Sequence, residues 1–339
     1  MSLVPRAEAI AAVGLAALVA VQLGAPARDR VLLDARITES SDLVASTLHP
    51  GLVWTTNDSG DPARVFGVDA SGKTVAVLHL RDARARDWEA LAPGRAADGT
   101  HLLWVGDLGD NRSTWPSVRV YRVVEPAHLG DQDVAWTSYD LRFADGPRDA
   151  EALLVDPADQ RLYVVSKRVD GAAVYVAPAH LRTDRVNLLT RVASAPSVVT
   201  DGAFSPDGLT VALRGYVWAW TSSSIRGPWH RIDIPLEPQG ESLTWTPDGS
   251  ALLIGSEGER SEVWRVPITL ATASSSASPK ATPSEPIGSP SVSQERTRIG
   301  SVSSPPRQSR GSSPGWRLLL GALALGAALS VAAAARRRR

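Results

Sequence analysis

The chain has 339 residues, of which 43% are hydrophobic, with a formal net charge of zero and no cysteine. Without cysteine, disulfides, a thiol nucleophile and a thiolate metal site are excluded. The charge is unevenly divided, because residues 28–270 carry 25 Lys and Arg against 33 Asp and Glu, whereas residues 271–339 carry 10 against 2. An acidic central part argues against nucleic acid as a partner.

Residues 1–27 are typical of a signal peptide. Arg6 precedes a small-apolar run from Ala9 to Leu23, and Ala25-Pro26-Ala27 offers a small-x-small cleavage site. We therefore expect cleavage after Ala27. An uncleaved N-terminal anchor is the alternative, although the run is short for a hydrocarbon core about 30 Å thick.

Residues 28–270 are predicted to form a single all-β domain. Short runs of Val, Ile, Leu, Tyr and Trp alternate with turn residues and show almost no helical period. Similar turns recur along the chain: LHPG (48–51), PGRAADG (93–99), VDPADQ (155–160), FSPDG (204–208) and WTPDG (245–249). Repeats of about 40 to 60 residues with about four strands each are typical of β-propeller blades.

Five repeat units are predicted, beginning at Glu39, Glu89, Glu151, Asp201 and Glu241. The last unit has only three clear strands, and residues 30–37 offer a spare strand that can complete it and remove an open sheet edge. We therefore predict a β-propeller of five blades. Six remain an option if the connection 124–149 contains another blade.

The first strand of each unit opens with acidic or polar residues, and the second strand ends in a polar cluster. Because the start of one antiparallel strand lies beside the end of the next, these segments should meet at one mouth of the central channel. Carboxylates gathered there repel one another unless they are protonated or bridged by cations, and their hard oxygens suit Ca²⁺ or Mg²⁺. The predicted metal ligands are Glu39, Asp58, Asp87, Glu89, Asp107, Asp110, Asp149, Glu151 and Glu241.

Three cations are predicted at the same mouth, namely Lys167, Arg168 and Arg214, which could hold a phosphate or carboxylate substrate as catalytic residues. Structural roles are the alternative for the acids. Those of DWEAL (87–91) and DAEAL (149–153) could cap backbone amides or pair with Arg86 and Arg148, and NDSGD (57–61) could be an ordinary turn.

The remainder of the chain predicts attachment to a membrane. Residues 271–314 are rich in Ser, Pro and Thr and should form a disordered stalk. Residues 315–339 contain an uncharged stretch followed by four arginines, which predicts a transmembrane helix with a basic cytoplasmic tail. We therefore expect a single-pass protein of the cell membrane, with the propeller outside the cytoplasm.

Six motifs stand out between about Glu39 and Ile268. They are WTTNDSGDPARVFGVDASG (54–72), DWEAL (87–91), VGDLGDN (105–111), DAEALLVDP (149–157), LYVVSKR (162–168) and SPDG…VALRGY (205–216). Together they resemble the motifs of exported bacterial propellers of the esterase-like and β-propeller phytase group. Phytase-type propellers use calcium at the channel mouth to bind phosphate and activate water. The resemblance implies that role for Asp58, Asp87, Glu89, Asp107, Asp149, Glu151 and Glu241, with Lys167 and Arg214 on the phosphate.

The sequence thus leaves two functions open. In one, the chain is a calcium-dependent hydrolase of phosphoesters or related esters that takes an anionic small molecule at the mouth. In the other, it is a non-catalytic propeller whose metal stabilises the mouth while it binds a cell-surface ligand or protein. A monomer is expected in both cases. Nucleotide binding by GVDASGKT (67–74) is not expected, because a predicted strand and not a helix follows it.

Overall fold

The structure is a computed structural model that describes residues 20–58 and 60–271, and this part of the chain is built from strands without a helix. Its strands fall into five consecutive groups. Group 1 contains β3 (Val44–Ala45), β4 (Val53–Thr55), β5 (Arg64–Val68) and β6 (Thr74–His79), with β10 (Asp131–Asp133) added beside β6. Group 2 contains β7 (Trp88–Arg95), β8 (His101–Asp107), β9 (Val118–Val124) and β11 (Trp136–Phe143).

Group 3 contains β12 (Ala150–Val155), β13 (Leu162–Ser166), β14 (Ala172–Val176) and β15 (Asn187–Ala195). Group 4 contains β16 (Asp201–Phe204), β17 (Val211–Arg214), β18 (Trp218–Ser222) and β19 (His230–Asp233). Group 5 contains β20 (Gly240–Trp245), β21 (Ala251–Ser256) and β22 (Glu262–Ala271), with β2 (Ala27–Val31) and β1 (Ala20–Leu23) paired to β22. The connection 124–149 therefore supplies strands to groups 1 and 2.

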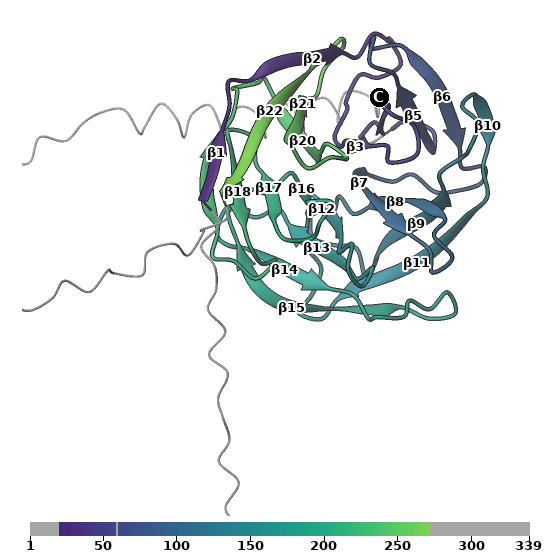
Figure 1. Ribbon diagram of the computed structural model, residues 1–339. Helices are drawn as coiled ribbons and strands as arrows, with labels where there is room; N and C mark the ends of the chain where they lie inside the picture. Colours follow the sequence, from purple (N-terminus) through teal and green to yellow (C-terminus); the bar gives the residue numbers. More distant parts are fainter. Residues whose placement is uncertain (1–19, 59, 272–339) are drawn as a thin grey trace, which may run out of the picture. The chain divides into compact units, whose positions relative to one another are not determined.

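The groups are arranged around a common centre (Figure 1). Their first strands, β3, β7, β12, β16 and β20, contact one another in a cycle that closes from β20 back to β3. Burial follows the same arrangement, because β12 and β20 are buried along their whole length while the outer strands β15 and β19 are partly exposed. Sheets placed radially around a centre are the arrangement of a β-propeller, as the turn repeats predicted.

The N-terminal strand closes the ring in the predicted manner but at a different place. β2 pairs antiparallel with β22, from Ala27 opposite Arg265 to Val31 opposite Glu262, so the pairing lies at 27–31 and not at 30–37. After Val31 the chain turns toward group 1, where the Leu33 amide donates to the Gly72 carbonyl at 2.9 Å.

Arg30 strengthens this closure. Its guanidinium is buried and donates to the carbonyl oxygens of Gly51, Val68 and Asp69 at 2.9, 3.1 and 3.0 Å. A strand of group 5 is thereby tied to the turns of group 1. Gly72 permits the close approach, since a Cβ at this position would lie 1.9 Å from the Val31 carbonyl oxygen.

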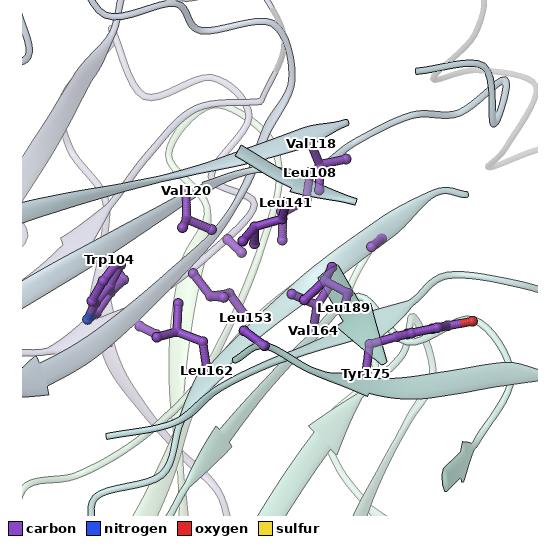
Figure 2. Close-up of a cluster of buried hydrophobic side chains, with 14 of the residues drawn as sticks. Trp104, Leu108, Val118, Val120, Leu141, Leu153, Leu162, Val164, Tyr175 and Leu189 are labelled. Carbon is purple, nitrogen blue, oxygen red and sulfur yellow. The ribbon is translucent and has the colours of Figure 1, made fainter. Parts of the chain in front are cut away.

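Apolar side chains fill the space between neighbouring groups. Figure 2 shows one such cluster between groups 2 and 3, to which Trp104, Leu108, Val118, Val120, Leu141, Leu153, Leu162, Val164, Tyr175 and Leu189 contribute. Burying each large side chain of this kind stabilises the fold by roughly 1.5–3 kcal/mol. The two groups are also joined by backbone, because β11 and β15 pair in parallel, with Leu141 opposite Asn187.

The predicted ends of the chain lie mostly beyond the described residues. The stalk and the C-terminal helix lie outside them, apart from Ala271 at the end of β22, and so do residues 1–19 of the predicted signal peptide. Residues 20–23 of that peptide form β1, which pairs with β22. Between residues 20 and 271, as far as the structure describes them, there is no helix of the length and hydrophobicity needed to span a membrane.

Candidate functional site

Three glutamates occupy the same position in three innermost strands. The pairing register shifts by one residue between Trp88 and Ala90, between Ala150 and Ala152, and between Gly240 and Ser242. The extra residue in each shift is Glu89, Glu151 or Glu241. A β-bulge of this kind redirects a side chain away from the regular pleat, which explains how carboxylates can stand in strands that are largely buried.

Groups 1 and 4 do not carry a glutamate at this position. In group 1 the extra residue falls between Ser40 and Val44, since Ser40 lies opposite Asn57 and Val44 opposite Trp54. In group 4 Asp201 pairs in register with Arg214, and its carboxylate accepts the backbone amides of Gly202 and Leu243 at 2.6 Å each. Asp201 therefore joins β16 to β20.

The ends of the second strands bring further charged groups close to the bulges. Asp58 follows the Asn57 bridge in group 1, Lys167 follows β13 and Glu257 follows β21. Burial raises the pKa of Glu89, Glu241 and Glu257, and the charge of Asp58 adds to each shift, so these side chains from different groups lie within electrostatic range of Asp58. We call Asp58, Asp87, Glu89, Glu151, Lys167, Glu241 and Glu257 the acidic group.

Asp58, Asp87 and Glu89 form the tightest part of the acidic group. One oxygen from each carboxylate lies within 4.8 Å of the other two. Burial, followed by the charge of Asp58 and a hydrogen bond with it, raises the pKa of Asp87 to about 9. Burial and then the charges of Asp58 and Glu151 raise the pKa of Glu89 well above its usual value. The charge of Asp58 thus adds to burial in opposing ionisation of Asp87 and Glu89.

Gly109 lies against this trio. A Cβ at Gly109 would be 2.7 Å from Asp87 Oδ2 and 2.8 Å from Glu89 Cγ. Beside it, the Asn111 amide donates to Asp87 Oδ2 at 3.3 Å. The motif Gly-Asp-Leu-Gly-Asp-Asn (106–111) thereby supplies both a close-packed backbone and a polar contact to the trio.

The other half of the acidic group contains a cation. The Lys167 ammonium pairs with Glu151 Oε1 and lies 4.9 Å from the centre of the Tyr216 ring. Glu151 is 3% exposed, and its second oxygen, Oε2, is buried without a hydrogen-bond partner among the described residues. Burial, opposed by the Lys167 charge and reinforced by the charge of Glu241, raises the pKa of Glu151 well above its usual value.

Glu241 and Glu257 share one neutral partner, Gln239. Its amide donates to Glu241 Oε1 at 3.3 Å and also to Glu257 Oε2. Burial is the main cause that raises the pKa of each glutamate to about 8. The charges of Asp58, Glu151 and Glu39 add to the shift at Glu257, which places Glu39 at the border of the acidic group.

Three other predicted ligands have structural contacts. Asp107 pairs with Arg86 at 2.8 Å and accepts the Arg86 and Asp87 amides at 3.1 and 2.9 Å, so it holds the start of β7. Asp110 accepts the Trp115 amide at 2.6 Å within its own loop. Asp149 accepts the Asp110 amide at 3.0 Å, and its charge contributes to the raised pKa of Asp87.

Two of the three predicted catalytic cations are placed elsewhere. The Arg168 side chain is 43% exposed and pairs with Asp170 at 2.8 Å. Arg214 is fully buried, where it pairs with Glu237 and donates to the Ser242 carbonyl at 3.1 Å. Arg214 therefore joins groups 4 and 5, and Lys167 is the predicted cation that the structure brings to the carboxylates.

Glu257, Gln239 and Tyr216 were not among the site residues predicted from the sequence. Gln239 stands two residues before its bulge glutamate, as Asp87 and Asp149 do before theirs. Superposing the three segments on their glutamates would have found it. Glu257 occupies the position after the second strand that Asp58 and Lys167 occupy in their own groups.

Comparison with known proteins leaves the family open. No protein-family model and no curated protein matches the chain. Among solved structures, the RRP9 WD40 repeats match with a TM-score of 0.40 and 11% identity, covering 73% of this chain and 100% of that one. A gluconolactonase from Xanthomonas campestris matches with a TM-score of 0.40 and 16% identity, covering 64% and 69%. These scores show neither a family nor a function for this chain, and the closed ring of strands described above defines the fold.

Proposed function

We propose that this chain is a divalent-cation-dependent hydrolase of phosphoesters or related esters, with its site at the mouth of a five-bladed propeller. The observation that carries the proposal is the convergence of the Asp58, Asp87 and Glu89 oxygens within 4.8 Å of one another. The closed cycle of five innermost strands supports the blade count. Attachment to the cell membrane through residues 271–339 is part of the proposal and rests on the sequence.

The trio has the donor chemistry of a site for a hard cation. It offers only carboxylate oxygens, which suit Ca²⁺ or Mg²⁺. Asp58 and Asp87 are only partly buried, so water and substrate can approach from their side. A divalent cation held there would supply a Lewis acid and lower the pKa of a water bound to it. Calcium is the cation that we propose first, because the trio can be completed by water without strict octahedral geometry.

The remaining residues of the acidic group suit proton transfer and charge balance. Glu241 has a pKa raised to about 8, so near neutrality it retains a proton that it could deliver to a leaving group. Lys167 offsets part of the negative charge of Glu151. Arg168 and Arg214 are engaged by Asp170 and Glu237, so a phosphoester substrate would depend on the bound cation for most of its charge compensation.

The test is turnover measured together with cation binding. The full-length chain, freed of cations by dialysis against a chelator, is titrated with calcium chloride by calorimetry and assayed with p-nitrophenyl phosphate and p-nitrophenyl acetate. We expect calcium-dependent hydrolysis of one of the two. Asp87→Asn with Glu89→Gln should lower calcium affinity and kcat/KM each by about 100-fold or more, because two ligands of the same site lose their charge.

Asp184→Asn is the matched control, since Asp184 is exposed and pairs only with its neighbour Arg182 in the described part of the chain. Asp184→Asn should change neither the calcium affinity nor kcat/KM. Calcium binding without hydrolysis of either ester would instead support the ligand-binding propeller. Absence of calcium and magnesium binding would exclude the proposed hydrolase.

A further inference from the structure

Lys167 is an ammonium ion enclosed by carboxylates. Its side chain is 17% exposed, and that of its partner Glu151 is 4% exposed. The charges of Glu241 and Glu89 also act on it. The ammonium therefore lies within the acidic group, paired with the Glu151 carboxylate.

The carboxylates around Lys167 have oxygen lone pairs that could bind a further ligand. Glu151 gives one oxygen to Lys167, while the other is buried and has no hydrogen-bond partner in the described part of the chain. Buried carboxylate oxygens are nearly always hydrogen-bonded, so this oxygen indicates a place for a ligand. The Glu241 carboxylate lies close enough for its charge to raise the pKa of Glu151.

These contacts resemble those of a bound cation. A lysine ammonium and a divalent cation are attracted by the same carboxylates, and two cations so close together would repel each other strongly in a site with little water. Only one of them can occupy the space beside Glu151. Lys167 pairs with Glu151, whereas Asp58, Asp87 and Glu89 bring one oxygen each within 4.8 Å of one another.

We infer that the Lys167 ammonium holds the place of a second cation, so that the acidic group takes one divalent cation at Asp58, Asp87 and Glu89. Replacing Lys167 by a neutral residue should then open a latent divalent-cation site at Glu151 and Glu241. The inference rests on the proposed cation site but not on catalysis. It also makes Lys167 a charge-balancing residue that positions Glu151, in place of the substrate ligand that the sequence predicted.

The test counts bound calcium by calorimetry on the full-length chain after dialysis against a chelator. The wild type should bind one equivalent at the acidic group, and Lys167→Met should bind two. Arg168→Met removes the same charge from the next residue, whose side chain pairs with Asp170, and should still bind one. Glu151→Gln combined with Lys167→Met should return the count to one, because the latent site loses a ligand.

The outcomes separate this inference from the proposed function. One equivalent in both the wild type and Lys167→Met, with equal affinity, would overturn the inference and leave the proposed cation site intact. No calcium bound by the wild type would overturn both. Binding of two equivalents of calcium by the wild type would show that Lys167 does not occupy the position of a second cation, and would also overturn the inference.

Folding of the variants is followed by circular dichroism, and Lys167→Gln serves as a second neutral variant that can still donate to Glu151. If either variant is unfolded without calcium, the inference expects calcium to restore the fold, because a second cation replaces the missing charge. Failure of both variants to fold at saturating calcium would overturn it.

Discussion

At the scale of single residues, the acidic group depends on where backbone allows carboxylates to approach one another. Glu89, Glu151 and Glu241 each occupy a bulge, and Asp58, Lys167 and Glu257 each follow a second strand. The fold thus repeats two backbone positions and varies the residue at each. Where the residue is Lys167 instead of an acid, its positive charge offsets the negative charge of the Glu151 carboxylate.

Gly109→Ala tests the packing against the trio. The new Cβ would meet Asp87 Oδ2 at 2.7 Å and Glu89 Cγ at 2.8 Å, so both carboxylates must move apart or tilt. We expect calcium affinity to fall about tenfold, or roughly 1.4 kcal/mol, as measured by calorimetry. Gly106→Ala is the control, because its Cβ would meet Leu108 and Ala90 instead and should lower the melting temperature without changing calcium affinity. Equal calcium affinity in Gly109→Ala and wild type would contradict the assignment of the trio.

The role of a residue could be predicted from the sequence where a short local spacing revealed it, and could not where the role depends on a partner distant along the chain. The spacing Asp-x-Glu in 87–89 and 149–151 predicted that carboxylates would gather, and the structure brings Asp87, Glu89 and Glu151 into one group. Arg214 shows the limit, since its partner Glu237 comes from a separate loop and no pattern around Arg214 reveals that pairing. Glu257 belongs to the polar cluster 255–259 that follows a second strand, but nothing in that cluster distinguished it as a member of the site.

At the scale of elements, β2 is the strand that joins the two ends of the described domain. A chain that begins at Arg28 keeps three of the four residues of β2 that pair with β22, Arg28, Arg30 and Val31, and also keeps the Arg30 contacts to group 1. A chain that begins at Leu33 loses all of them and leaves β22 with an open edge. The addition of an N-terminal strand to the last group was predictable, because that unit has only three clear strands in the sequence. The residues of β2 that pair with β22 were not predictable.

We therefore expect deletion of residues 1–27 to lower the melting temperature by only a few degrees, whereas deletion of residues 1–32 should lower it by about 10 °C or more or prevent folding. Loss of several buried contacts of a few kcal/mol in total would account for a change of this size. Thermal unfolding followed by circular dichroism measures both. Similar melting temperatures for the two truncated chains would show that β2 does not close the ring.

At the scale of the whole molecule, ring closure and the raised pKa values act together on stability. The acidic group draws its members from groups 1, 2, 3 and 5, so it exists only when the ring is closed. Burial raises the pKa of Asp42 to about 7 and is the main cause of the rise to about 8 at Glu241 and about 9 at Asp87. These carboxyls are therefore more strongly protonated in the folded chain than in the unfolded one.

The sign of the pH dependence follows from this difference. Because the folded pKa values lie above the unfolded ones of about 4, the folded state binds more protons, and stability falls as the pH rises from about 5 to 9. Calcium requires ionised ligands, so its stabilising effect should grow over the same range. We expect the melting temperature without calcium to decline from pH 5 to pH 9, and the increase caused by calcium to be largest at pH 9. A melting temperature without calcium that is independent of pH would contradict the burial of these groups.

The parallel pairing of β11 with β15 has a consequence for behaviour at high concentration. Strands at the edge of a sheet can recruit strands from other molecules and start aggregation. β11 and β15, which would otherwise be the outer edges of groups 2 and 3, occupy each other's free hydrogen-bonding side in one eight-stranded sheet. Group 4 keeps an outer edge at β19, where the exposed Arg231 and Asp233 form an ion pair and discourage strand addition. A surface patterned in this way would let many copies stand close together without joining edge to edge.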